Sequence, residues 1–166
     1  MEKGKKVVVM LTKVFFSEHP KSGQETHFAE LVKAGKKIHT CRDNFNYWAE
    51  KIASLKRTGG VLSVRQWSGK PYRSPQEIVV EIPASKVGVS ELIVERIFIP
   101  SVRLRPSEMT AYKASIGDTQ IDIKKLAKND GFSYEGDFVS FINPLFNKYQ
   151  RNMIRLAIIH FNEFEY

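Results

Sequence analysis

The chain of 166 residues has little of what would place it in an oxidising compartment or a membrane. Its single cysteine, Cys41, cannot form an intramolecular disulfide. No apolar run reaches the 18 residues of a membrane span, and no small-residue cleavage site follows the basic N-terminus. Repeats and linkers rich in Gly, Ser or Pro are also missing. We therefore expect one cytoplasmic domain over residues 1–166, with no membrane partner.

Negative charge is scarce in the first half of the chain. The net charge is +8, but residues 1–73 carry a balance of +9 and residues 74–166 a balance of −1. A one-sided basic field attracts anions, and ligands that carry phosphate are the commonest anions to use one. The alternative is a lysine-rich surface that only keeps the protein soluble.

The hydrophobic pattern predicts an α+β fold with more strands than helices, because β-branched and aromatic runs alternate with a few amphipathic segments. Not being arranged as βαβ units, the short strands favour a mixed sheet or small β-barrel flanked by helices. The predicted strands cover residues 7–16, 38–42, 61–67, 77–82, 91–99, 116–121 and 153–161.

Four helices are predicted from capping residues and apolar spacing. Ser22 and Glu25 form a capping-box pattern for the first helix, which Gly35 ends. Asp43 or Asn44 caps the second, whose buried face includes Trp48 and which Gly59-Gly60 ends. A third helix contains Ile123, Leu126 and Ala127 and ends near residues 129–131, and a fourth begins at Ser133 and ends before Pro144.

The stretch GKKIHTCR, residues 35–42, gathers groups that suit an anion. In a strand, Thr40 and Arg42 share one face, while His39 and Cys41 share the other. Arg42 offers a planar fork, Lys37 a mobile charge and Thr40 a hydroxyl, so we predict that these residues, with Lys36, bind an anionic ligand in one pocket. We predict a structural role for His39. Cys41 is predicted to be a small buried apolar residue.

This stretch resembles the GxKxxTxR motif of ASCH domains, small RNA-associated β-barrels of the PUA-like superfamily. The later segment LAKNDGF, residues 126–132, followed by a helix and a closing strand, is similar to the end of many ASCH proteins. The resemblance covers residues 35–166 and implies a PUA-like barrel. The chain is longer than the smallest members, chiefly over Asn44–Arg57 and Ser85–Gln120.

A second cationic stretch, RQWSGKPYRS, covers residues 65–74. It interleaves cations and aromatic rings, a composition typical of surfaces that stack bases and neutralise phosphates. Aromatic packing across a cationic hairpin is the competing interpretation. The residues are Arg65, Trp67, Lys70, Tyr72 and Arg73.

Three functions follow from these observations. The first is a module whose basic cleft, built by the GxKxxTxR motif and the cationic hairpin, binds RNA or a nucleotide. The second is a protein-interaction domain with a vestigial cleft, whose partners the sequence does not specify. No cofactor is expected, and no pair of His, Cys or carboxylate residues has metal-ligand spacing.

The third function is implied by the resemblance, because some small bacterial ASCH proteins are amidohydrolases that deacetylate acetylated cytidine. Their catalytic Lys and Thr correspond to Lys37 and Thr40, and Asp130 stands where they have Glu. Thr40 would attack the amide, neutral Lys37 would take its proton, and Asp130 would protonate the leaving amine. The shorter Asp side chain displaces that proton donor by about 1.5 Å, which weakens this alternative.

Overall fold

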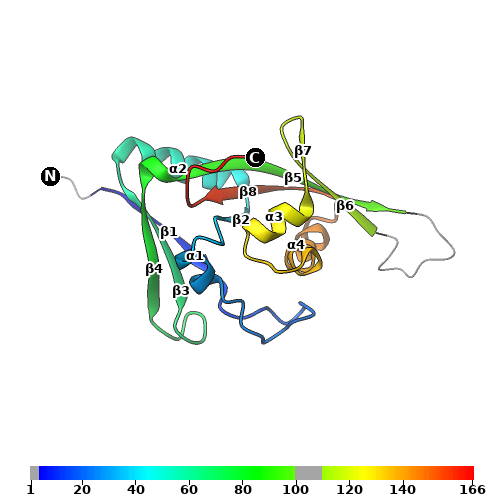
Figure 1. The fold of residues 1–166 in the computed structure, drawn as a ribbon, viewed down its shortest axis with the longest axis horizontal. Coiled ribbons are helices and arrows are strands. Elements are labelled where there is room, and N and C mark those ends of the chain that lie inside the picture. The colour runs from blue at the N-terminus through cyan, green and yellow to red at the C-terminus, as the bar shows by residue number, and fades with distance from the viewer. Residues whose placement is uncertain (1–3, 100–109) are drawn as a thin grey trace.

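The computed structural model describes residues 4–99 and 110–166 and shows a mixed α+β fold (Figure 1). The α+β class predicted from the sequence is confirmed. The elements are β1 (Lys6–Leu11), α1 (Phe28–Lys33), β2 (His39–Asp43), α2 (Phe45–Thr58), β3 (Val61–Trp67), β4 (Gln76–Pro83), a 3-10 turn (Ala84–Lys86), β5 (Gly88–Phe98), β6 (Thr110–Ile116), β7 (Thr119–Ile121), α3 (Ile123–Asn129), α4 (Glu135–Tyr149) and β8 (Met153–His160).

The strands form two sheets. The smaller has the order β1-β3-β4, with β1 parallel to β3 and β3 antiparallel to β4. The larger has the order β2-β8-β5-β6-β7, in which all neighbours are antiparallel. These pairings among the described strands leave both sheets open, so the predicted closed barrel is not confirmed.

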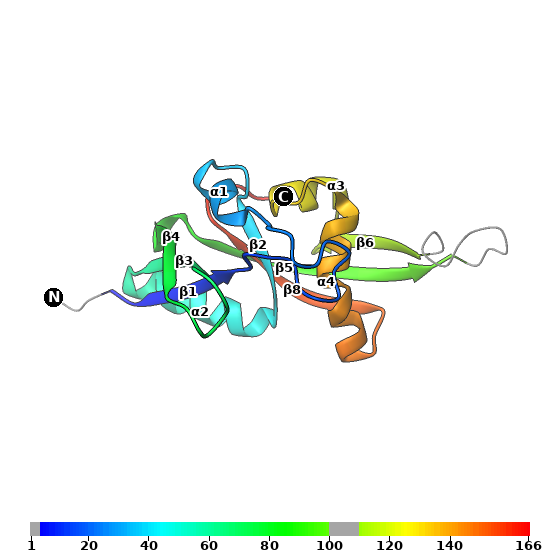
Figure 2. The same ribbon diagram turned by 90° about the horizontal axis from the view of Figure 1, so that it is seen from below.

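Helices cover both faces of the larger sheet. Strand β8 is buried on both faces, which explains its almost continuous apolar sequence. On one face Arg155 of β8 lies over the Phe45 ring of α2, with 5.6 Å from its guanidinium carbon to the ring centroid. On the other face lie α3 and α4 (Figure 2). One hydrophobic core joins residues of both sheets, including Val9, Leu62 and Ile158.

The first strand is shorter than the sequence predicts, and the capping box is wrong. Strand β1 ends at Leu11, and a long loop precedes α1. That helix begins at Phe28, whose backbone N–H donates to the Thr26 hydroxyl at 3.3 Å. Ser22 lies instead in a turn closed by its own N–H on the His19 carbonyl. Tertiary contacts of the loop outweigh the local pattern.

The fourth helix continues through Pro144, where the sequence predicts its end. Phe138, Ile142 and Phe146 recur every four residues along one buried face. Burial of Phe146 beyond the proline offsets the lost backbone hydrogen bond. The strand predicted over 116–121 is a hairpin instead, because Gly117 at φ 56° turns the chain between β6 and β7. No helix among residues 4–99 and 110–166 is long and apolar enough to cross a membrane.

Candidate functional site

Lys37 lies in the core and forms an ion pair with Asp130. Helix α1 ends at Lys33, and Gly35 follows in a left-handed conformation at φ 67°. The N–H groups of Lys36 and Lys37 both bind the Leu31 carbonyl. This tight reversal leaves Lys36 exposed and turns Lys37 inward, where it is 1% exposed. The Lys37 ammonium donates to both the carboxylate and the backbone carbonyl of Asp130.

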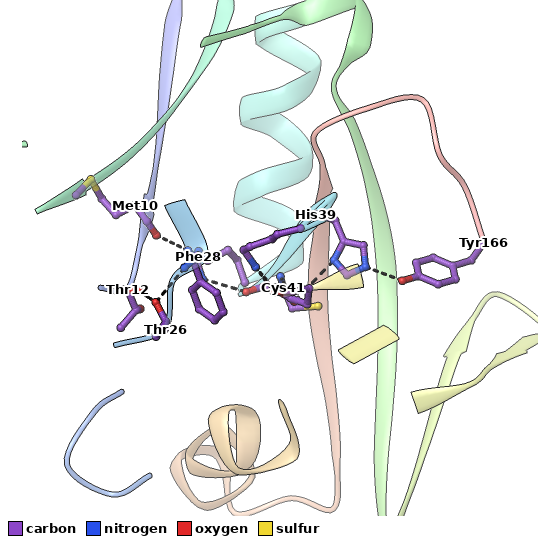
Figure 3. A network of polar contacts seen from close by, with 10 residues as sticks. Met10, Thr12, Thr26, Phe28, His39, Cys41 and Tyr166 are labelled. Atoms are coloured by element: carbon purple, nitrogen blue, oxygen red, sulfur yellow. Dashed lines mark hydrogen bonds and ion pairs between the residues drawn. The ribbon is translucent and has the colours of Figure 1, made fainter. Parts of the chain in front are cut away.

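Asp130 occupies the end of α3 and is only 3% exposed. Its second carboxylate oxygen accepts the Cys41 backbone N–H at 2.9 Å and lies 3.7 Å from Nδ1 of His39. The His39 ring in turn meets the Tyr166 hydroxyl through Nε2 at 2.6 Å. A line of polar contacts thus runs from Met10 of β1 through the core to Tyr166 (Figure 3).

Burial dominates the electrostatics of this network. Desolvation lowers the pKa of Lys37, and the adjacent Asp130 carboxylate opposes that shift. Desolvation also lowers the pKa of His39 to about 4, so that its imidazole is neutral at pH 7. The pKa of the buried Cys41 thiol is raised well above its ordinary value, again chiefly by burial. The thiol therefore stays protonated, as expected for a structural residue.

Thr40 and Arg42 occupy the other face of β2 from His39 and Cys41. Thr40 is 3% exposed and stands opposite Ile159 of β8 in the sheet. Among the described residues, its hydroxyl forms no hydrogen bond with Lys37 or Asp130. Arg42 donates one N–H to the Met10 carbonyl and another to the Cys41 carbonyl at 3.2 Å. The motif therefore builds a buried framework around Lys37 and sends only Arg42 toward β1.

Three residues of the network could together hold a metal ion. One ligand atom each from His39, Cys41 and Asp130 lies within 4.8 Å of the others. Sequence spacing could not show this cluster, because Asp130 arrives from the far end of α3. The Lys37 ammonium on the same carboxylate and the raised pKa of Cys41 both oppose a cation there.

An open hollow lies beside this framework, between the end of β1 and the β3–β4 hairpin. Its volume is about 580 Å³, within the roughly 300–1,000 Å³ typical of small-molecule sites. We call it the Trp67 hollow. Its walls are mainly apolar and include Met10, Val14, Phe16, Trp67, Pro71 and Tyr72.

The two aromatic rings of the hairpin meet at this hollow. Trp67 and Tyr72 have ring centroids 5.2 Å apart, with planes inclined by 50°. Tyr72 is 90% exposed and adopts φ 61°, a conformation that costs a residue other than glycine about 1 kcal/mol. Burial of the ring does not offset that cost. Tyr72 is therefore a strained, exposed aromatic residue at the wall of the hollow.

The loop that carries Tyr72 is held by its own hydrogen bonds. The Ser74 hydroxyl accepts the Gly69 N–H at 3.0 Å and donates to the Lys70 carbonyl at 2.8 Å. The Ser68 N–H binds the Pro75 carbonyl at 2.9 Å and closes the hairpin. Tyr72 is therefore displayed on an ordered loop.

The predicted cations of the hairpin are placed unequally. Lys70 lines the Trp67 hollow, whereas Arg73 is exposed on the same loop. Arg65 is engaged away from it, with Nε on the Ser63 hydroxyl at 2.9 Å and Nη1 on the Gln76 side chain at 3.1 Å. A further lining cation is Lys13, whose ammonium donates to the Ser68 carbonyl at 2.8 Å.

Sequence reasoning missed Lys13, Met10 and Phe16 as wall residues of the hollow. Val14 to Phe16 were expected to continue a strand, so nothing in the pattern pointed to a loop folded against the hairpin. Comparison of the chain with protein-family models, curated proteins and solved structures finds no match.

Proposed function

We propose that this protein is a binding module for RNA or a nucleotide and that a base lies in the Trp67 hollow. The observation that carries the proposal is the 90% exposed, backbone-strained Tyr72 ring held 5.2 Å from Trp67 at a hollow of suitable size. Unstacked bases bind aromatic faces with about 1–3 kcal/mol per base. The ring pair supplies such faces without requiring a particular base.

Cations around the Trp67 hollow suit the phosphates of the same ligand. Lys13 and Lys70 line it, and Arg73 stands on the loop above. They belong to the half of the chain that carries the positive balance of +9. Phosphate contacts of this kind supply affinity that falls as salt rises.

The proposed relationship to ASCH domains has two supports. The GxKxxTxR stretch and the DGF segment meet in space through the Lys37–Asp130 ion pair. The two open sheets also share one hydrophobic core, as the halves of a PUA-like barrel would. In this interpretation the motif residues position the wall of the site, and the hairpin contacts the ligand.

The alternative, hydrolysis of acetylated cytidine, has weaker support. Lys37 would have to take the Thr40 proton, but its amino group is hydrogen-bonded to the carboxylate and backbone carbonyl of Asp130 instead. Thr40 lies on the opposite face of β2 from His39, whose Nδ1 is 3.7 Å from the Asp130 carboxylate. We expect no cytidine to be released from N4-acetylcytidine. Turnover that disappears in both Lys37→Ala and Thr40→Ala would instead establish the enzyme.

Fluorescence titration tests the binding module. Trp48→Phe leaves Trp67 as the only tryptophan, so its emission reports on the hollow. In this background we expect hexa-adenylate RNA and AMP to quench the emission. Tyr72→Ala should weaken both affinities about 10-fold or more, given the energy of one stacked base. Unchanged emission with every ligand would refute the proposal.

A salt series tests the phosphate contacts. Lys70→Ala with Arg73→Ala should reduce the slope of log affinity against log salt by about 1.4 for hexa-adenylate, since each single-strand phosphate contact contributes about 0.7. The matched control is Lys56→Ala with Arg57→Ala at the exposed end of α2. That end adjoins the start of β3, about 20 Å from Trp67. Equal effects of the two pairs would show that only net charge matters.

A further inference from the structure

A second hollow adjoins the first one. We call it the Leu145 hollow. It has a volume of about 360 Å³ and lies between β2, β8 and α4. Its walls include Phe16, Glu18, Cys41, Arg42, Asp43, Phe141 and Leu145. Phe16 lines both hollows, so its ring stands where they meet.

Arg42 holds the junction of the two hollows. Its two hydrogen bonds reach Met10, which lines the Trp67 hollow, and Cys41, which lines the Leu145 hollow. Both acceptors are neutral carbonyls, and no carboxylate lies within 4 Å of the guanidinium in the part of the chain that the structure describes. A guanidinium has five N–H donors, so three remain for a ligand. The Asp130 carboxylate attracts Arg42 only from beyond ion-pair distance. The half-buried guanidinium itself lines the Leu145 hollow and is a suitable site for a phosphate.

Away from Arg42, the Leu145 hollow favours a base over a phosphate. Asp43 lines this hollow but is paired with the Lys148 ammonium at 3.1 Å, so Glu18 is the lining carboxylate that would repel a phosphate placed beside it. Carboxylates instead accept hydrogen bonds from the amino groups of bases. The apolar rings and aliphatic groups of Phe141 and Leu145 offer the rest of the surface.

From this arrangement we propose that the ligand is single-stranded nucleic acid, bound as two consecutive nucleotides. This inference depends on the proposed function, because the first base lies in the Trp67 hollow. The linking phosphodiester lies on Arg42 beside Phe16, and the second base enters the Leu145 hollow. A paired strand does not fit, because both bases must leave the stack to enter separate hollows.

The dinucleotide ApA and the mononucleotide AMP distinguish this proposal from simple charge attraction. AMP carries a charge of about −1.5 to −2 at pH 7, whereas the single phosphodiester of ApA carries about −1. Electrostatics alone would therefore favour AMP. We expect ApA to quench Trp67 emission in the Trp48→Phe background with at least 10-fold higher affinity than AMP. A 12-base-pair RNA duplex should bind no more tightly than AMP.

A variant that fills the Leu145 hollow isolates the second base. Leu145 is only partly buried, and Leu145→Arg should place a long side chain in the hollow while the backbone carbonyls that hold Arg42 stay in place. We expect it to abolish the advantage of ApA over AMP while AMP affinity stays within 2-fold. Asn147→Arg, at an exposed position of α4 that does not line the hollow, matches the added charge. Circular dichroism confirms that each variant is folded.

The outcomes separate the two proposals. If AMP does not quench Trp67 emission in the Trp48→Phe protein, with no substitution in either hollow, the proposed function itself is overturned. AMP binding with ApA no tighter would overturn only the two-nucleotide inference. An ApA advantage that survives Leu145→Arg would also overturn it, because the second base would then lie elsewhere.

Discussion

The ammonium group of Lys37 and the carboxylate of Asp130 form an ion pair in the protein core, although the two residues are 93 positions apart in the chain. Their side chains are 0% and 4% exposed. The pair joins the start of β2 to the end of α3, and Asp130 also accepts the Cys41 backbone N–H. It therefore holds together the two segments on which the sequence-based prediction of a site depends.

Breaking this ion pair should destabilise the fold strongly. Lys37→Met leaves the Asp130 carboxylate buried without its cation, and loss of one partner of a buried pair costs about 3–5 kcal/mol. Because the two residues interact, the double variant Lys37→Met/Asp130→Asn should lose less free energy of unfolding than the two single variants lose together. Urea unfolding followed by circular dichroism measures all three.

The control for this cycle is the exposed pair of Lys6 and Glu81, whose charged atoms are 2.6 Å apart. Lys6→Met should leave the free energy of unfolding nearly unchanged, since solvent screens surface pairs. Equal effects of Lys37→Met and Lys6→Met would contradict the buried ion pair.

Acid should destabilise the protein through His39. Burial lowers the folded-state pKa of His39 to about 4, whereas the unfolded value is about 6.5. Above pH 6.5 the imidazole is neutral in both states. Between pH 6.5 and 4 only the unfolded state binds the proton, so stability falls as pH falls, by about 3 kcal/mol in total.

Urea midpoints at pH 7.5, 6 and 5 measure this loss. His39→Asn should flatten the dependence, leaving the smaller contribution of His160, whose pKa burial also lowers. His27→Asn is the matched control, because His27 is exposed. A dependence that stays as steep in His39→Asn would assign the effect to another group.

Gly131 should not tolerate a side chain. It adopts φ 90°, and an added Cβ would lie 3.1 Å from Cδ of Lys37 and 3.2 Å from Cδ1 of Phe28. Gly131→Ala combines backbone strain with overpacking, and we expect a loss of about 2–4 kcal/mol. Gly117 adopts φ 56° and has open space around it, so Gly117→Ala measures the stability lost to backbone strain alone. Similar losses in both variants, measured by thermal unfolding, would contradict tight packing around Lys37.

Substitution of Tyr72 should weaken ligand binding without lowering the stability of the fold. Tyr72→Gly relieves the left-handed conformation but makes the unfolded chain more flexible, so stability should change by less than about 0.5 kcal/mol. Affinity for hexa-adenylate should nevertheless fall about 10-fold or more, because one stacking face is lost. Thermal unfolding and fluorescence titration of the same preparation test both. A variant that unfolds readily and binds normally would make Tyr72 a structural residue.

The local elements were predictable where short-range chemistry determines them. Asn44 caps α2 through its side chain on the Tyr47 N–H at 3.2 Å, and Gly59 ends that helix at φ 62°. Strand β3 matches its predicted bounds because β-branched and apolar residues fill a buried run. The start of α1 was not predictable, because the loop before it is fixed by contacts such as that between Thr26 and Thr12.

By itself, the sequence determined the α+β class, most element positions and the residues that carry positive charge. Those features follow from backbone preferences, apolar spacing and composition, which act over a few neighbouring residues. Only the tertiary structure decided that Lys37 is buried on Asp130, while Tyr72 remains exposed beside Trp67. Burial and pairing of charge depend on segments far apart in the chain, so the same lysine and aromatic residues suit either a core or a binding surface until the sheets are assembled.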